Sequence, residues 1–315
     1  MNSKSRKPFP RRRRPDKDIY QRITGKIVDQ LETGVRPWHQ PWGANGTPTR
    51  PLRHNGVPYR GINTMLLWME TTANGYVSPY WMTYRQAQEL GGQVRKGEIS
   101  ALVVYAGAIE TTEEAENGEE IEQRIPFLKG YPVFNCDQID NLPARFTPTP
   151  AEPRSPMKRF AHADAFFAHT GAKIHFGGNK AFYSPLEDFI GMPPFEAFES
   201  PDAYVSVLAH ETAHWTRHPT RLNRDFGRKT WGDDGYAMEE VVAEVSAALI
   251  CADLGIESEP REDHAAYIGS WLKVLKNDKR AVFQAAAHAE RAAAYLHSLQ
   301  PDAPSTDDAP LAATA

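Results

Sequence analysis

Residues 201–215 read Pro-Asp-Ala-Tyr-Val-Ser-Val-Leu-Ala-His-Glu-Thr-Ala-His-Trp. The preceding residue, Ser200, and the proline in the first position are typical of a helix start, so the segment is predicted to be helical. The pattern His-Glu-x-x-His at 210–214 then lies within that helix. Its spacing is significant because residues four apart share one face of a helix.

Both imidazoles of this pattern can therefore reach one cation. His210 and His214 are predicted to bind the metal, since tetrahedral zinc favours nitrogen ligands and keeps one position open in catalytic sites. Glu211 lies about 100° around the helix from His210. From there it can act as the catalytic base toward water at the cation without binding the metal itself.

A second acidic helix is predicted at residues 235–254 and contains Glu240 and Glu244, four residues apart on one face. One of them can supply the third metal ligand, while the other holds a histidine N–H in place. A buried carboxylate pair needs a charge partner, which a cation would provide. The alternative is an exposed acidic strip on a surface helix. Such a ligand set can also take Mn²⁺ or another divalent ion in place of Zn²⁺.

The rest of the C-terminal part is predicted to be mainly helical. A proline-rich linker at 143–155 precedes it. Gly177-Gly178-Asn179 between apolar residues predicts a hairpin. The further elements expected here are helices at 156–170, 262–276 and 278–299, hairpin strands at 173–176 and 181–183, and a disordered tail at 301–315.

The N-terminal part is predicted to mix helices and strands, which makes the fold class α+β. Isoleucines and leucine at four-residue spacing predict a helix over 16–32. Thr83 and Gln86 form a capping-box pattern at the start of another. The remaining expected elements are a helix at 62–73 and strands at 99–109 and 124–134, joined by an acidic segment at 110–122. These boundaries predict one domain over 16–142 and a second over 156–300.

The charge is divided unequally between the two parts. Residues 1–105 carry 17 Lys and Arg against 7 Asp and Glu, a net charge of +10, whereas residues 106–315 carry 19 against 33, a net charge of −14. This asymmetry favours a polyanion as the partner of the N-terminal part. No apolar run approaches the ~20 residues of a membrane span, and the first residues lack a secretory signal pattern. With two distant cysteines, a cytoplasmic location is expected.

Single-stranded nucleic acid is bound by stacking bases on aromatic rings within a cationic groove. Arginines and tryptophans are interleaved in the N-terminal part, which begins with a basic, flexible arm over 1–15. The loop residues Trp38 and Trp42 are the better stacking candidates. The predicted DNA-binding residues are Arg12, Arg13, Arg14, Trp38, Trp42, Arg60, Trp81, Arg85, Arg95 and Lys96. Binding is expected to be salt-sensitive and independent of base sequence.

Several longer motifs make the sequence recognisable. In the N-terminal part they are Pro37-Trp38-His39-Gln40-Pro41-Trp42, Tyr59-Arg60-Gly61-Ile62-Asn63, Trp81-Met82-Thr83-Tyr84-Arg85-Gln86-Ala87 and Phe134-Asn135-Cys136-Asp137-Gln138. In the C-terminal part they are His210-Glu211-Thr212-Ala213-His214-Trp215-Thr216, Arg221-Leu222-Asn223-Arg224 and Glu239-Glu240-Val241-Val242-Ala243-Glu244. With these motifs the sequence resembles the ArdC-type antirestriction proteins of conjugative plasmids, and also the N-terminal part of TraC-type plasmid primases.

The resemblance implies an N-terminal domain that binds single-stranded DNA and a C-terminal zincin-like metallopeptidase domain. It also implies a role in protecting incoming plasmid DNA from host restriction during conjugation. By analogy with zincins that use a Glu as third ligand, Glu240 binds the metal and Glu244 supports a histidine, although the opposite assignment stays open. The expected partners are single-stranded DNA and, as a possible peptidase target, a host restriction protein; no membrane is expected. The alternative function is a non-enzymatic DNA coat whose metal site is structural or a docking module.

Overall fold

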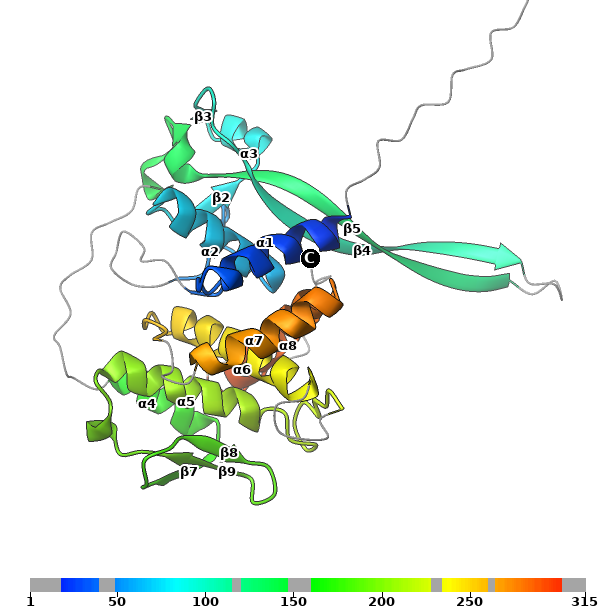
Figure 1. Ribbon diagram of the computed structural model, residues 1–315. Coiled ribbons are helices and arrows are strands. Elements are labelled where there is room, and N and C mark those ends of the chain that lie inside the picture. The colour runs from blue at the N-terminus through cyan, green and yellow to red at the C-terminus, as the bar shows by residue number, and fades with distance from the viewer. Residues whose placement is uncertain are drawn as a thin grey trace, which may run out of the picture.

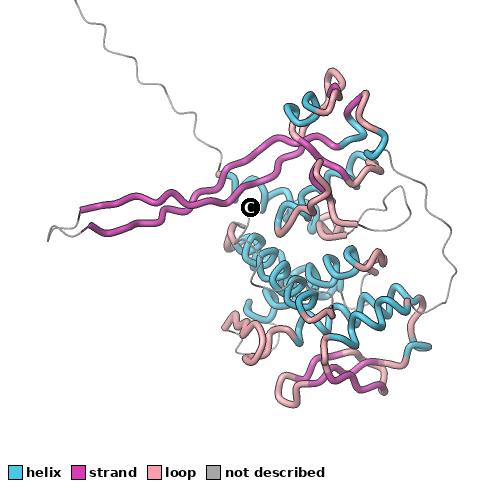
Figure 2. The backbone as a smooth tube through the Cα atoms, turned by 180° about the vertical axis from the view of Figure 1, so that it is seen from behind, coloured by secondary structure: helices cyan, strands magenta, loops and turns pink. Residues whose placement is uncertain are grey.

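A long antiparallel ribbon is the central feature of the N-terminal part. The computed structural model describes residues 18–39, 49–114, 120–146, 160–227, 234–259 and 264–301. In it, β4 (Ala101–Glu114) pairs with β5 (Glu120–Asn135) from Ala101↔Val133 out to Glu114↔Glu120. The outer half of this ribbon projects away from the rest of the molecule (Figures 1 and 2). Both strands therefore extend beyond their predicted ranges.

The inner half of the ribbon belongs to a four-stranded sheet with the order β1-β2-β5-β4. β1 (Leu52–Arg53) runs parallel to β2 (Tyr80–Met82), which is antiparallel to β5. The other elements of this part are α1 (Ile19–Glu32), α2 (Ile62–Asn74), α3 (Tyr84–Glu89), the paired short strands β3 (Gln93–Val94) and β6 (Ile139–Asp140), and two 3-10 turns at Cys136–Gln138 and Ala144–Phe146. α2 packs against β4, and α1 lies against β5 and α7.

Local sequence signals account for the helix starts in this part. The carboxylate of Asp18 accepts hydrogen bonds from the amides of Tyr20 and Gln21, so α1 begins at residue 19. The capping box predicted at Thr83 is present. The Gln86 amide donates to the Thr83 hydroxyl, and the Thr83 amide donates to the Gln86 side chain.

The C-terminal part is built mainly from helices, as predicted. They are α4 (Ala161–His169), α5 (Pro201–Trp215), α6 (Asp234–Asp253), α7 (His264–Asn277) and α8 (Ala281–Ser298). The Ser200 hydroxyl caps α5 by accepting from the Ala203 amide at 2.9 Å. α6 is buried along most of its length because α5, α7 and α8 pack around it. Among the helices that the structure describes, none has the length and apolar character of a membrane span.

A small sheet beside α5 differs from the prediction. β7 (Lys173–Phe176) and β8 (Phe182–Ser184) do not form a hairpin, because β9 (Phe189–Met192) lies between them in the order β7-β9-β8. β9 pairs parallel with β7 and antiparallel with β8. Its residues Ile190 and Met192 are fully buried, so the apolar character of β9 makes it the central strand. The sequence reading missed this short strand, and the hairpin prediction was wrong.

The two parts of the chain share one hydrophobic core. Buried residues of α1 and α2 belong to the same cluster as those of α5 to α8. Trp38, which follows α1, packs edge to face on Trp271 of α7, with ring centroids 5.4 Å apart. In Figure 1, α7 and α8 lie between the N-terminal elements and α5.

A charge cluster ties the same two parts together. The guanidinium of Arg50 makes bidentate contacts with Asp253 at the end of α6, at 2.5 and 2.7 Å, and with Glu290 of α8, at 2.9 and 3.0 Å. Burial opposes ionisation of Asp253. The hydrogen bond from His297 and the charge of Arg50 more than offset this effect and lower its pKa. Because Arg50 itself is buried, this cluster is an internal clamp.

Arg50→Met is expected to lower the free energy of unfolding by about 3–5 kcal/mol, because it leaves the carboxylates of Asp253 and Glu290 largely buried beside each other without the guanidinium. Urea denaturation followed by far-UV circular dichroism measures the change. The matched control is Arg85→Met, which removes an exposed arginine paired with Glu89 and is expected to cost less than about 1 kcal/mol. Equal stability of the two variants would contradict the clamp.

Candidate metal centre

Two packed helices bring the sequence-predicted metal residues together. α5 carries His210, Glu211 and His214 in its last two turns, and α6 carries Glu240 and Glu244 near its middle. The side chains of all five are largely buried. The acidic residues of α6 therefore do not form an exposed strip. They lie in the interface between the two helices.

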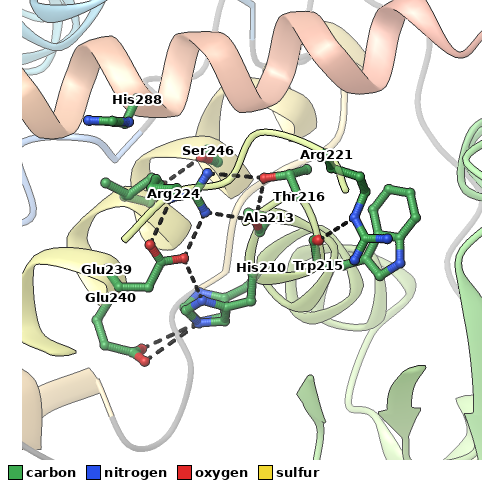
Figure 3. A network of polar contacts seen from close by, with 12 residues as sticks. His210, Ala213, Trp215, Thr216, Arg221, Arg224, Glu239, Glu240, Ser246 and His288 are labelled. Carbon is green, nitrogen blue, oxygen red and sulfur yellow. Dashed lines mark hydrogen bonds and ion pairs between the residues drawn. The ribbon is translucent and has the colours of Figure 1, made fainter. Parts of the chain in front are cut away.

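The ligand atoms have the spacing of a metal site. The Nε2 atoms of His210 and His214 are 3.1 Å apart, and each lies 3.5 Å from a carboxylate oxygen of Glu240. Figure 3 shows the Glu240 carboxylate facing the imidazole of His210. Zn–N and Zn–O bonds of about 2.0–2.1 Å at tetrahedral angles separate ligand atoms by roughly 3.3–3.4 Å. The observed separations of 3.1 and 3.5 Å are close to this value, with Glu240 Oε2 facing His210 and Oε1 facing His214, so the three side chains could hold one small divalent cation.

The outer nitrogen of each imidazole faces a further carboxylate. Nδ1 of His214 lies 3.1 Å from Glu239 Oε1, and Nδ1 of His210 lies 3.5 Å from Glu244 Oε1. The latter nitrogen is buried and has no hydrogen-bond partner in the structure. A proton on Nδ1 would point toward each carboxylate and leave Nε2 as the metal-facing atom.

A buried arginine that the sequence reading did not single out holds Glu239 in place. Arg224 donates to both carboxylate oxygens of Glu239, each at 2.7 Å. It also donates to the carbonyl of Ala213 at 3.0 Å and to the hydroxyl of Thr216 at 3.1 Å, and so ties Glu239 to the end of α5 (Figure 3). Both residues occur in the recognised family motifs, but neither has a spacing that reveals its role.

The electrostatics favour positive charge at the centre. Burial opposes ionisation of Glu240, but the neighbouring imidazoles of His214 and His210 more than offset it and lower its pKa to about 2. At Glu239, burial is outweighed by the hydrogen bonds from Arg224 and His214, and the pKa again falls to about 2. Burial opposes protonation of His214, yet Glu240 and Glu239 raise its pKa. The site therefore stabilises a cation, either a proton on His214 or a metal ion.

Two of the predicted DNA-binding tryptophans, Trp38 and Trp81, are not available for stacking. Trp38 and Trp81 are each 1% exposed, because Trp38 packs on Trp271 and Trp81 belongs to a core beneath the N-terminal sheet. Their burial therefore contradicts their assignment as DNA-binding residues. The apolar area of these rings is used for the core, a role that single-sequence reasoning does not distinguish from stacking.

The predicted basic contacts remain accessible where the structure describes them. Arg60, Arg85, Arg95 and Lys96 are exposed or partly exposed. Arg85 pairs with Glu89, and Arg95 pairs with Glu98 and Asp140, so part of their charge is already compensated. The other predicted contacts lie outside the described residues: Arg12, Arg13, Arg14 and Trp42.

Comparisons with known protein families match both parts of the chain. A family model for zincin-like metallopeptidases matches residues 161–288. A model for the N-terminal domain of the anti-restriction factor ArdC matches residues 17–134. The α+β fold with two such regions is therefore that of an ArdC-type protein.

Curated relatives extend over nearly the whole chain. Protein y4eC of Sinorhizobium fredii (strain NBRC 101917 / NGR234) is 40% identical over 292 residues, which cover 91% of this chain and 94% of that protein. DNA primase TraC of Escherichia coli is 35% identical over 295 residues, or 87% of this chain. The match spans only 26% of that primase, so this chain corresponds to about a quarter of its length.

Solved structures show the same architecture. The metal-free crystal structure of the antirestriction protein ArdC from plasmid R388 matches with a TM-score of 0.78 and 45% identity, covering 90% of this chain and 97% of that chain. Its Mn(II)-bound crystal structure matches with a TM-score of 0.75 and 43% identity, covering 90% and 99%. The chain therefore belongs to the ArdC family of antirestriction proteins.

Proposed function

We propose that this protein binds single-stranded DNA through its N-terminal part and carries a zinc-dependent peptidase site in its C-terminal part, and that it protects incoming conjugative DNA from host restriction in the cytoplasm. The observation that carries the peptidase proposal is the buried cluster of His210, His214 and Glu240, whose ligand atoms all lie within 4.8 Å of one another. The Mn(II)-bound crystal structure of the relative from plasmid R388 supports a divalent metal at this type of site.

In this proposal each side chain of the centre has one task. His210, His214 and Glu240 hold the cation, which is Zn²⁺ or another divalent ion such as Mn²⁺. When bound, the cation supplies Lewis acidity toward water and a peptide carbonyl. Glu211, which is buried beside His214, takes the proton from the attacking water. Glu244 and Glu239 orient the two imidazoles.

Two observations support the proposed DNA binding: the net charge of the N-terminal residues and the family model that matches them. The N-terminal residues carry a net positive charge, and the family model that matches them describes the N-terminal domain of an anti-restriction factor. The TraC relatives are DNA primases by name. Holding DNA next to a peptidase site would raise the local concentration of proteins bound to the same strand, such as a host restriction protein.

A second candidate function is a DNA coat in which the metal is structural. The depth of the metal site favours it, because His210 and Glu240 are 2% and 6% exposed. A peptide must reach the open metal position, whereas a structural metal needs no access. The two functions separate in a cellular assay, where a coat protects plasmid DNA without any contribution from Glu211.

His214→Ala is expected to abolish metal binding, because two ligands cannot hold a tetrahedral ion with useful affinity. Elemental analysis of the purified protein should show about one divalent ion per chain in the wild type and less than about a tenth of that in the variant. His218→Ala is the matched control, since His218 lies one turn further along and contacts Thr220. Full metal content in His214→Ala, or loss in His218→Ala, would refute the ligand assignment.

Glu239→Gln is expected to weaken metal binding about 10- to 100-fold, because it removes the charge that orients His214 and pairs with Arg224. Competition with a chelator of known affinity measures the change. Asp188→Asn provides the control, since Asp188 pairs with Arg221, the other arginine that follows the metal motif. If both variants keep wild-type metal affinity and differ only in melting temperature, Glu239 has a purely structural role.

Glu211→Gln is expected to keep metal and DNA binding but to reduce peptide cleavage by at least about 100-fold, because the amide cannot take a proton. Cleavage of candidate proteins bound to the same single strand is followed by gel electrophoresis, and plasmid protection is measured in cells. If wild type and variant are equally inert and protect equally well, the peptidase proposal fails and the coat remains.

A further inference from the structure

The exposed aromatic residues of the N-terminal part gather on the ribbon. Among the residues that the structure describes there, the large aromatic side chains more than a third exposed are Tyr84, Tyr105 and Tyr131. The last two lie on neighbouring strands, where Tyr105 is paired with Lys129 and Tyr131 with Val103. Directly opposed residues of an antiparallel pair share one face, so both tyrosines and the lysine project from the same side of the ribbon.

This face is the outward continuation of a buried one. Val103 and Val133 are covered and belong to the core beneath the sheet with Trp81. Moving outward along the ribbon, the cover ends, and Tyr131 and Tyr105 are each 37% exposed. On this side of the ribbon, the aromatic face therefore begins where the core that covers Val103 and Val133 ends.

The opposite face of the same segment is occupied by the protein itself. Leu102 and Leu128 pack on the main core, as does Ile19 of α1. The position of a Cβ on Gly130 would lie 2.8 Å from Leu102 and 3.8 Å from Ile19. The tyrosine face is consequently the side that this part of the ribbon presents to an outside partner.

A third aromatic ring continues the row. A Cβ on Gly107 would lie 2.6 Å from the ring of its cross-strand partner Phe127, so only glycine leaves room for that ring to lie across the strand. The Phe127 ring centroid is 6.0 Å from that of Tyr105. At the other end, Nζ of Lys129 lies 5.0 Å from the centre of the Tyr131 ring. Three rings and one ammonium thus line one short strip.

We propose that Tyr105 and Tyr131 are the base-stacking side chains for single-stranded DNA, with Phe127 extending the row and Lys129 contacting the phosphates. The inference rests on the proposed DNA-binding function and assigns its location. Aromatic rings beside a cationic group are the elements that bind single strands without sequence preference. This strip, rather than the buried Trp38 and Trp81, is therefore the proposed stacking surface.

The sequence of the outer ribbon limits where DNA would lie. Beyond Ala108 the sequences of the paired strands hold five glutamates, Glu110, Glu113 and Glu114 on β4 and Glu120 and Glu122 on β5, against one arginine, Arg124. Carboxylates repel phosphates. The single-stranded DNA is therefore expected to lie along the inner half of the ribbon, closer to the basic residues of the N-terminal part.

The test is binding of a fluorescein-labelled oligothymidylate of 20 nucleotides, followed by fluorescence anisotropy. Tyr105→Leu and Tyr131→Leu are each expected to weaken binding at least about fivefold, and the double variant at least about twentyfold, as expected for loss of base stacking. The double Tyr→Phe variant keeps the rings and should bind like the wild type. Lys129→Gln should reduce the slope of log Kd against log salt by about 0.7.

Tyr84→Leu is the matched control, because Tyr84 is 44% exposed in the same part of the chain but lies on α3. Its affinity should not change. A second measurement uses the wild type alone: bound oligothymidylate should protect Tyr105 and Tyr131, but not Tyr84, from nitration by tetranitromethane. This readout stays informative if a leucine variant does not fold.

The outcomes distinguish the inference from the function on which it rests. If the wild type binds the oligonucleotide while the double leucine variant binds equally well and nitration is unchanged, the ribbon assignment is wrong and the DNA-binding function stands. If the wild type binds no single-stranded DNA, both are overturned. Loss of binding in Tyr84→Leu as well would place the contact elsewhere and would also refute the ribbon assignment.

Discussion

The structure depends on how α5 and α6 tolerate several carboxylates in their shared interface. Glu211, Glu239, Glu240 and Glu244 are all buried there, and burying unpaired negative charge is strongly unfavourable. Arg224 compensates Glu239 through a bidentate ion pair. The remaining carboxylates face two imidazoles. This excess of buried negative charge favours the binding of a cation. The carboxylates that must be compensated for the interface to be stable thus include Glu240, which could hold a metal ion with His210 and His214.

Features encoded over a few residues could be predicted from the sequence. Ser200 capping α5, Asp18 capping α1 and the box at Thr83 depend only on neighbouring amides. The approach of His210 to His214 follows from four-residue helical spacing. Glu240 could be predicted as a candidate ligand because two histidines on one helix need a third protein ligand, and an acidic residue on a following helix can supply it.

Features that depend on contacts between distant parts of the chain could not be predicted from the sequence. A tryptophan such as Trp38 looks the same in sequence whether it stacks on a base or on Trp271, 233 residues later. The insertion of β9 between β7 and β8 is a tertiary outcome that turn residues at Gly177 do not encode. Likewise, Arg224 acquires its role only when α6 brings Glu239 beside the end of α5.

The shared hydrophobic core bears on whether the N-terminal and C-terminal parts can occur separately in other proteins. Helices from both parts bury their apolar faces against each other, and Arg50 joins the parts through Asp253 and Glu290. Either part alone would therefore expose apolar side chains that are buried in the whole protein. Recombination that separated the halves would expose these faces, and such fragments would tend to aggregate. The similarity to the TraC primases accordingly runs through both parts and covers 87–90% of this chain. In these two longer proteins the two parts therefore occur together.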